Sequence, residues 1–404
     1  MTRQDARALD AVDPLAHFRD RFVLPDGVLY LDGNSLGALP RAVPAALADT
    51  ATRQWGTRLI RSWNEGWIDA PQRLGATIAP LIGAEPQEVI VGDTTSTHLF
   101  KAIVAALRHD PARRTVVSEA GNFPTDLHIA EGAVACVPGA RLKVVERAAL
   151  ADALDGDTAL LLLTHVHYKT SERFDLAAWT ARAHAAGALM LWDFSHSIGA
   201  VPIDVTGAGV DLAVGCTYKY LNGGPGAPAF LYVASRLQDA LANPISGWMG
   251  HAEPFAFQDG YRPAAGMRRW LVGTPSILAM ASLEAALALW AEVDMAALSA
   301  KSAALFAILA EAGAAAGLPC VSPVDPARRG SHISFRHANA YELTQALIAR
   351  GVIGDFRDPD ILRLGLTPLY LSHEDVWQAG EHLREIVATA AWRDPAFAQR
   401  NMVT

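Results

Sequence analysis

The feature that most constrains the fold of this chain is a regular alternation of short apolar runs with helical patterns between residues 84 and 234. The runs are rich in Val, Leu and Ile and apolar on both faces, as in parallel strands buried between two layers of helices. We expect strands at residues 88–93, 114–119, 141–146, 159–166, 188–193, 212–217 and 229–234. Helical patterns separate them, for example at 97–108 and 176–187. This alternation predicts an α/β fold, in which a mostly parallel sheet carries helices on both faces.

The pattern of the sequence changes after Thr274. A long helical region rich in Ala and Leu leads into a mixed segment with strand patterns near 332–337 and 361–366. These features predict a smaller α+β domain at the C-terminal end. We expect an N-terminal segment that packs with the small domain, a large domain and the small domain, at residues 1–40, 41–275 and 276–404.

Charge and composition narrow the class of partner. The formal net charge of −8 disfavours nucleic acid or an anionic membrane. The three cysteines lie far apart and form no CxxC pair, so we predict neither a disulfide framework nor a metal site. The apolar segment from Ile277 is interrupted by Glu284, Glu292 and Asp294, which predicts a packed helix rather than a membrane span. The first residues, MTRQDARALD, lack the apolar stretch of a secretory signal, so we expect a cytoplasmic protein.

Ligands of open α/β sheets bind beyond the carboxyl ends of the strands, so the residues that follow each strand are candidate site residues. Lys219 follows the strand at 212–217 and stands between Tyr218 and Tyr220, before the glycine-rich stretch NGGPG. An unprotonated lysine in such a place is a nucleophile that bonds to an aldehyde. The alternative is a solvated lysine at a strand end, which is the commoner case for an isolated lysine.

Asp193 ends the strongly apolar strand at 188–193, where an ionised carboxylate is costly without a cationic partner. It precedes Lys219 by 219 − 193 = 26 residues, about one strand–helix–strand step. His196 follows three residues after Asp193 and is a second candidate at this edge of the sheet. The alternative for Asp193 is a cap on the next helix.

Two further loops follow strands of the same sheet. Thr94, Thr95 and Ser96 lie where the first strand turns into a helix. Backbone N–H groups and hydroxyls at such a turn predict a phosphate site, with plain helix capping as the alternative. Phe123 and Pro124 follow the second strand, where the phenyl ring either covers a ligand or anchors the loop.

One cofactor accounts for these features together. Pyridoxal 5′-phosphate needs a lysine for its aldehyde, a carboxylate for its ring nitrogen and a site for its phosphate dianion. The glycines after Lys219 match no GxGxxG motif followed by an acid, which disfavours a dinucleotide site. His165 and His167 share one strand face, but the sequence places no third metal ligand near them.

Short motifs along nearly the whole chain share the order of a known family. They are YLDGNSLG (30–37), RSWN (61–64), DTTS (93–96), NFPTDL (122–127), LTHVHYKT (163–170), WDFSHSIGAVP (192–202), GCTYKYLNGGPG (215–226), SGWMGH (246–251), RGSHISF (329–335), RGVIGDFR (350–357) and LRLGLTPLY (362–370). In these motifs the chain resembles the fold-type I, aspartate aminotransferase-like, pyridoxal-phosphate enzymes and, within them, the kynureninases. The resemblance implies hydrolysis of the Cβ–Cγ bond of L-kynurenine, or of its 3-hydroxy derivative, to anthranilate or 3-hydroxyanthranilate and L-alanine in tryptophan catabolism. It also implies a homodimer with active sites at the subunit interface.

At matching positions the resemblance implies a role for each candidate residue. Lys219 bonds to the cofactor aldehyde, Asp193 holds the ring nitrogen, and Phe123 stacks on the ring. The remaining contacts to the cofactor are Thr94, Thr95, Pro124, Thr125, Asp126, Thr164, His196 and Tyr218. Trp248 and Thr274 resemble phosphate contacts that reach across a dimer interface. Some members carry Asn in place of Thr274, and a hydroxyl can still donate.

The resemblance also implies a substrate site. Arg363 binds the α-carboxylate of the substrate through its forked guanidinium, with a structural salt bridge as the alternative. Ser35 lines the substrate, and Trp63 stands where other members have a histidine beside the aromatic ring. Tyr218 relays a proton or only binds phosphate.

Two other functions stay open at this point. One is a cysteine desulfurase-like lyase of the same fold, which needs a mobile catalytic cysteine, and Cys320 in LPCVSP is the available residue. The other is a catalytically silent binding protein on the same scaffold. The presence of both Lys219 and Asp193 disfavours the silent protein.

Overall fold

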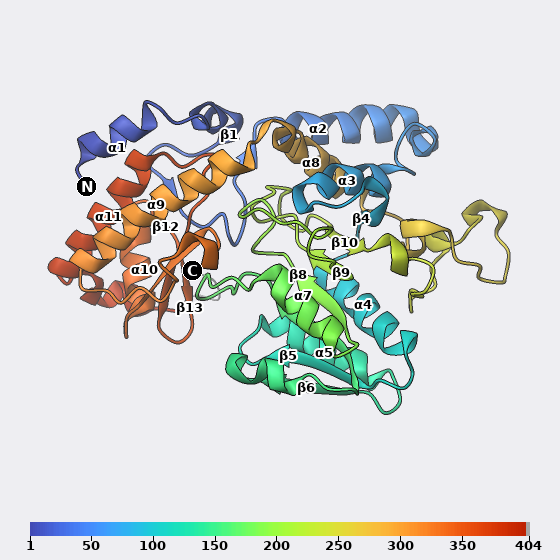
Figure 1. Ribbon diagram of the computed structural model, residues 1–404. Helices are drawn as coiled ribbons and strands as arrows, with labels where there is room; N and C mark the ends of the chain where they lie inside the picture. The colour runs from blue at the N-terminus through green and yellow to red at the C-terminus, as the bar shows by residue number, and fades with distance from the viewer. Residues whose placement is uncertain (401–404) are drawn as a thin grey trace.

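The computed structural model describes residues 1–400, and its centre is a seven-stranded sheet (Figure 1). The strands are ordered β4-β10-β9-β8-β7-β5-β6. Their bounds are β4 Val89–Gly92, β5 Thr115–Glu119, β6 Arg141–Val145, β7 Thr158–Thr164, β8 Leu189–Asp193, β9 Leu212–Gly215 and β10 Ala229–Val233. The seven predicted strands are all present, and β10 pairs antiparallel with β4 and β9 while the other pairs are parallel. The predicted α/β fold is confirmed.

Alternate residues of the central strands enter two hydrophobic cores. On β7, Leu161 and Leu163 join one core, whereas Leu160 and Leu162 join the other. The first core includes residues of α3 Ala70–Ile78, α7 Leu176–Ala185 and α8 Ile277–Leu287, and the second those of α4 Thr95–His109 and α5 Pro124–Ala135. The central sheet is therefore buried on both faces, because helices cover each side.

Strand β6 departs from the predicted pattern. We expected it to be apolar on both faces, yet none of its residues is buried. The strand lies at the edge of the sheet and pairs with β5. Arg141 and Lys143 are its charged residues, and charged side chains on an edge strand protect it from pairing with other chains.

The C-terminal region forms a second layer of structure, drawn in orange and red in Figure 1. Its sheet has the order β11-β14-β13 and is antiparallel. The elements are α9 Met295–Ala315, β11 His332–Arg336, α10 Ala340–Ile348, β12 Val352–Ile353, β13 Asp355–Arg357, β14 Ile361–Gly365 and α11 His373–Ala388. This arrangement is the expected α+β region.

The apolar segment from Ile277 is not the single helix that we expected. Helix α8 ends at Leu287, a 3-10 turn follows, and α9 begins at Met295. Asp294 starts α9, because its side chain accepts a 2.8 Å hydrogen bond from the N–H of Ala296. The acidic residue that argued against a membrane span is thus the cap that divides the segment.

Helix α9 is long and apolar enough, by length and composition, to cross a membrane. A core helix passes the same test, and α9 packs closely against α11. Its buried Lys301 forms an ion pair of 2.6 Å with Asp13, which ties the N-terminal segment to the helix. The residues of α9 therefore match a helix inside a folded protein.

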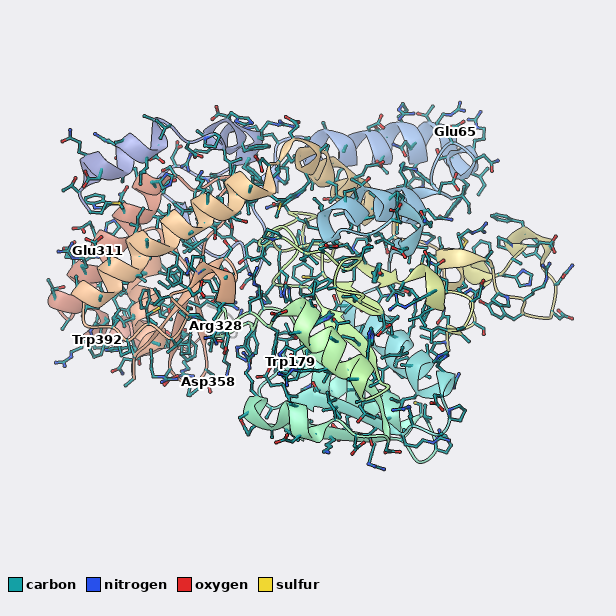
Figure 2. All side chains as sticks on the ribbon, in the orientation of Figure 1. Glu65, Trp179, Glu311, Arg328, Asp358 and Trp392 are labelled. Atoms are coloured by element: carbon teal, nitrogen blue, oxygen red, sulfur yellow. The ribbon has the colours of Figure 1, made fainter. Side chains whose placement is uncertain are left out.

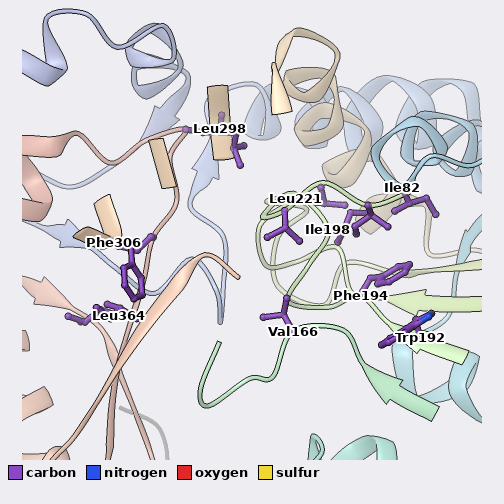
Figure 3. Packing of buried hydrophobic residues seen from close by; sticks show 14 of the residues in the cluster. Ile82, Val166, Trp192, Phe194, Ile198, Leu221, Leu298, Phe306 and Leu364 are labelled. Carbon is purple, nitrogen blue, oxygen red and sulfur yellow. The ribbon is translucent and has the colours of Figure 1, made fainter. Parts of the chain in front are cut away.

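One hydrophobic core joins the large sheet to the C-terminal region. Ile198 and Leu221 come from the side of the large sheet, and Leu298, Phe306 and Leu364 come from the C-terminal region, within one cluster of buried residues. Figure 3 shows these residues on the two sides of the boundary. Motion of one region against the other is resisted by this shared core.

The N-terminal segment lies against the C-terminal region. Helix α1 Arg3–Asp10 packs on α11, and β2 Leu29–Tyr30 pairs in parallel with β12. The remaining elements before the large sheet are β1 Phe22–Val23, β3 Leu39–Pro40 and α2 Val43–Asp49, and α6 Leu150–Ala153 follows β6. The division at residues 40 and 275 stays a prediction.

Candidate active site

Lys219 lies in a loop after β9 and is 8% exposed. Its Nζ is 2.9 Å from Nε2 of His196 and 5.7 Å from the centroid of the Phe123 ring. The loop is fixed by its own backbone, since the N–H of Asn222 donates to the carbonyl of Lys219 at 2.9 Å. Burial, and next the positive charge of Lys219, lower the pKa of His196 well below its ordinary value, so its imidazole is neutral. The amine therefore faces a neutral hydrogen-bond partner.

Asp193 ends β8 beside Thr164, the last residue of β7, with which it is in register. The carboxyl group is buried and accepts a 2.7 Å hydrogen bond from the N–H of Ser195. Burial raises the pKa of Asp193, although Ser195 and Lys219 oppose that shift. Such an acid becomes a stable carboxylate when a cation lies beside it.

A second buried carboxyl group lies near the first. Thr164 donates from Oγ1 to Oδ2 of Asp126 at 3.0 Å and is also bonded to Asn122. Burial, and next the charge of Asp193, raise the pKa of Asp126 well above its ordinary value. Asp126 Oδ1 and His196 Nδ1 are buried and have no hydrogen-bond partner among residues 1–400. Buried polar atoms of this kind call for a polar ligand.

Thr94 and Thr95 open helix α4 at the end of β4. The side chain of Thr94 caps the helix, accepting a 3.2 Å hydrogen bond from the N–H of Thr97. This contact agrees with the capping alternative, and the Thr94 hydroxyl also lies 3.1 Å from Oγ1 of Thr97. The N–H groups of the first helical turn point out of the helix, where they favour an anion.

Arg363 lies on β14 and is buried against an acidic partner that the sequence analysis missed. Its Nε donates to Oδ1 of Asp355 at 2.8 Å, and its Nη2 bonds to Oδ2 of the same carboxylate and to Ser35 at 2.9 Å. Burial opposes ionisation, but Arg363 and then Arg357 lower the pKa of Asp355 to about 2. The signal that could have revealed Asp355 is its short distance along the sequence from Arg363, 8 residues. Strands β13 and β14 place the two residues directly opposite each other.

Asp32 adds a second carboxyl group to this cluster. Burial, and next the charge of Asp355, raise the pKa of Asp32 to about 8. Arg357 supplies a second guanidinium, donating to Ser35 at 3.2 Å and to Asp355 at 2.7 Å. Its buried Nε has no partner within the described part of the chain. Ser35, predicted to line the substrate, therefore joins two arginines and one carboxylate.

The structure does not bring all the predicted residues together. Trp63 packs edge-on against Trp67, with ring centroids 5.7 Å apart, while Trp248 and Thr274 lie at the surface. Within residues 1–400 of one chain, no hydrogen bond, ion pair or ring contact joins any of these three to Lys219, His196 or Asp193. Pro124 and Thr125 start α5, directly after Phe123, whose ring meets Tyr168 at 5.2 Å.

A large cleft lies elsewhere. A space of about 940 Å³ separates α7 from the C-terminal region, and Figure 2 labels Trp179 and Arg328 on its two sides. Neither Lys219 nor Asp193 lines this cleft. The chemistry-bearing cluster therefore lies outside this cleft.

The residues around Lys219 fit pyridoxal phosphate. The lysine, the buried carboxyl group of Asp193 and the start of α4 all follow strands of one sheet, as the parts of that cofactor require. The unpaired oxygen of Asp126 and nitrogen of His196 give the pocket two further polar contacts. These donors and acceptors match an aromatic ring that bears polar substituents.

Comparison with known proteins identifies close relatives. The chain is 52% identical over 414 residues to the kynureninase of Burkholderia mallei (strain SAVP1) and 50% identical over 414 residues to that of Pseudomonas fluorescens. Each comparison covers 100% of both chains. Residues 298–383 also match the family model described as the kynureninase C-terminal domain.

Solved structures share the fold at much lower identity. A cysteine desulfurase from Thermococcus onnurineus NA1 has a TM-score of 0.78 and 17% identity, covering 93% of this chain and 98% of the other. The lyase C-DES, with glycine covalently linked to its PLP cofactor, has a TM-score of 0.78 and 18% identity over 90% and 98% of the chains. At these identities the likeness concerns the fold alone.

Proposed function

Since this chain belongs to the kynureninase family, we propose that the buried cluster around Lys219 is the site where it cleaves its substrate. The protein is a pyridoxal-phosphate-dependent hydrolase that splits the Cβ–Cγ bond of L-kynurenine to anthranilate and L-alanine. The observation that carries the site is the buried Lys219, 2.9 Å from His196 and one strand from Asp193. Tryptophan catabolism is the pathway that this reaction serves.

Each part of the cofactor has a residue to hold it. Lys219 would hold the aldehyde carbon and Asp193 the ring nitrogen, and Phe123 would cover the ring face. Thr94, Thr95 and Tyr218 hold the phosphate at the start of α4, and Asp126, Thr164 and His196 contact the ring substituents. When bound, pyridoxal phosphate supplies a protonated ring that withdraws electrons from the carbon atoms of the substrate.

Proton transfer falls to Lys219 and Tyr218. The Nζ of Lys219 would accept the proton from the substrate Cα. His196 is neutral, so it orients the amine by a hydrogen bond without adding a like charge beside it. Burial raises the pKa of Tyr218, so the phenol keeps its proton at neutral pH. As water bonds to the Cγ carbonyl carbon and the Cβ–Cγ bond breaks, Tyr218 would donate that proton to Cβ and regain one from the water.

Arg363 is the proposed anchor for the α-carboxylate of the substrate. Asp355 holds the guanidinium plane on one edge, and the remaining donors face Ser35 and the carbonyl of Tyr168. A guanidinium fixed in this way is preorganised for a carboxylate. Ser35 lines the same place, and Trp63 is proposed to stack on the aromatic ring of kynurenine or of 3-hydroxykynurenine.

The active enzyme is proposed to be a cytoplasmic homodimer. Trp248 is 41% exposed, and Phe255 and Phe257 nearby are 57% and 78% exposed. They belong to the segment that projects in yellow at the right of Figure 1. Large exposed aromatic side chains favour burial against a second copy, which brings Trp248 and Thr274 to the partner's cofactor phosphate. The unpaired state of Cys136, Cys216 and Cys320 suits a reducing compartment.

A cysteine desulfurase-like function is not favoured. Desulfurases share the fold with this chain, whereas its relatives at 50–52% identity are kynureninases. Partial burial raises the pKa of the Cys320 thiol, which disfavours the reactive thiolate. Its Sγ is 3.6 Å from the carbonyl of Ser322, within a backbone turn beside β11.

Two measurements test the proposed site. Borohydride reduction of the holoenzyme should trap the cofactor on a peptide that contains Lys219, and Lys219→Ala should lack both the absorbance of lysine-bound cofactor and turnover. Anthranilate fluorescence and alanine should appear in equal amounts from kynurenine. Trapping at another lysine would refute the assignment of Lys219 without touching the reaction itself.

A further inference from the structure

The ammonium group of Lys101 is enclosed in the protein although nothing in the proposed chemistry uses it. The side chain, on the second turn of α4, is 0% exposed. Its Nζ forms an ion pair with Asp93 and donates a 2.7 Å hydrogen bond to the carbonyl of Trp270. A buried lysine is costly without such partners, so these two contacts define what the side chain holds in place.

The first contact acts on the turn that precedes α4. Asp93 has a φ of 45°, in the left-handed region that L residues other than Asn, Asp and Gly rarely occupy. Its carbonyl accepts a 3.1 Å hydrogen bond from Ala229 on β10, so Lys101 and β10 together fix the residue. Thr94 and Thr95 follow at once, and their orientation depends on this unusual backbone.

The second contact acts on a distant segment of the chain. Trp270 ends a 3-10 turn, and four residues later comes Thr274. The carbonyl of Val272 accepts a 3.2 Å hydrogen bond from Met249, next to Trp248. A Cβ on Gly247 would lie 2.2 Å from the carbonyl oxygen of Val272, so the backbones at residues 247 and 272 are in direct contact.

We propose that Lys101 is a positioning residue for the phosphate of the cofactor. It joins the cradle of its own site, at Thr94 and Thr95, to the segment that carries Trp248 and Thr274. The inference rests on the proposed function, in which all four residues contact phosphate. Lys101 does not touch the phosphate, and Asp93 neutralises its charge, so its effect is to fix backbone rather than to attract the anion.

If Lys101 has this role, its removal should weaken binding of the cofactor phosphate but not binding of the cofactor ring. Without Lys101, Asp93 keeps only its hydrogen bond to Ala229, and the first turn of α4 no longer presents its N–H groups in one orientation. The pocket of Lys219, Asp193 and Phe123 lies at other strand ends and keeps its geometry. Affinity for a cofactor that lacks phosphate should therefore be unaffected.

The test titrates the full-length apoenzyme with pyridoxal phosphate and, separately, with pyridoxal, following absorbance and protein fluorescence. Lys101→Met should bind pyridoxal phosphate at least about tenfold more weakly, as expected for loss of a charge-assisted hydrogen bond, and pyridoxal within about twofold of the unaltered protein. Asp93→Asn, which tolerates the same φ but forms no ion pair, should behave in the same way. The double variant should be no worse than either single variant, because one contact is removed in all three.

A matched control is Lys143→Met. Lys143 also donates to a carbonyl, that of Ala153 at 2.9 Å, and lies 3.9 Å from Asp155, but at the edge strand β6. The Lys143→Met variant should bind pyridoxal phosphate and pyridoxal as tightly as the unaltered protein does. If Lys101→Met is poorly folded by circular dichroism, Asp93→Asn decides the test.

Equal weakening for both ligands, or unchanged affinity for pyridoxal phosphate, overturns the role of Lys101. Failure of the unaltered protein to bind pyridoxal phosphate at all would refute the proposed site instead, so the two failures differ.

Discussion

Asp355 and Arg363 face each other on adjacent antiparallel strands and form a buried ion pair, in which Nε of Arg363 donates to Oδ1 of Asp355 at 2.8 Å. The pair supports both interpretations of Arg363, as an anchor for the substrate and as a structural salt bridge. Removing Arg363 alone leaves the buried carboxylate of Asp355 with only Arg357 and Ser35 as partners, which destabilises the fold because the ion pair with Arg363 is lost. The two roles therefore separate only when both partners are changed.

Arg363→Ala should lower kcat/KM by about 30-fold to several thousand-fold, since losing one partner of a desolvated charge pair costs roughly 2–5 kcal/mol. Arg363→Ala combined with Asp355→Asn also removes the buried charge that has lost one of its two arginines, and should recover part of the lost thermal stability but not the activity. Steady-state kinetics and thermal melts with an unchanged cofactor spectrum measure both. A double variant that regains activity within a few-fold would make Arg363 structural.

Hybrid dimers should show whether active sites are shared. A Lys219→Ala protomer supplies an intact Trp248, and a Trp248→Ala protomer supplies an intact Lys219, so a mixed dimer contains one complete site. Mixing the two inactive proteins should restore part of the activity, up to about half per mixed dimer. Each variant incubated alone is the control, and full activity of a monomer at high dilution would contradict the proposal.

The stability of the protein should fall as the pH is lowered below 6.5, in part through His165. Burial, and next the charge of Arg173, lower the pKa of His165 to about 3. At pH 7 both folded and unfolded states are neutral at this residue. Between pH 6.5 and 3 the unfolded state binds a proton that the folded state excludes, so each pH unit costs up to about 1.4 kcal/mol.

His165→Leu removes this proton uptake from the unfolded state. Its melting temperature relative to the unaltered protein should rise as the pH falls from 7 to 4.5, whatever the offset at pH 7. Differential scanning calorimetry over that range measures the difference, in which the other buried histidines cancel. A pH-independent difference would show that His165 binds its proton equally in the folded and unfolded states, so that burial does not lower its pKa.

Tyr218→Phe should reduce kcat, by up to the roughly 10²–10⁴-fold typical of a general acid–base group. Burial raises the pKa of the phenol, so the loss should not depend on pH between 6 and 9.

Cys320→Ser should leave the rate of anthranilate release nearly unchanged. Sulfide release from cysteine at a comparable kcat/KM, with no anthranilate from kynurenine, would overturn the assigned reaction.

The large sheet could be predicted because its strands, apart from the edge strand β6, are runs of apolar residues followed by a turn. The ends of these strands located Lys219, Asp193 and His196. These three side chains lie close together because parallel strands end at the same edge of a sheet. Asp355 was missed because its role depends on the β13–β14 register, which no periodicity signals. The break after Leu287 was missed because a single cap, Asp294, decides it within a uniformly apolar segment.

Strand β10 lies between β4 and β9, and this placement sets an order of events during synthesis. β4 ends at Gly92 and its hydrogen-bonding partner begins at Ala229, so 229 − 92 = 137 residues separate them. At typical elongation rates, the ribosome needs roughly 7–27 s to add that length of chain. For all that time the strand that leads into the phosphate cradle has no neighbour in its sheet. In a nascent chain of this protein the backbone of the stretch VIVG therefore stays unpaired until the last strand of the sheet is made, and that interval is when a chaperone is of most use.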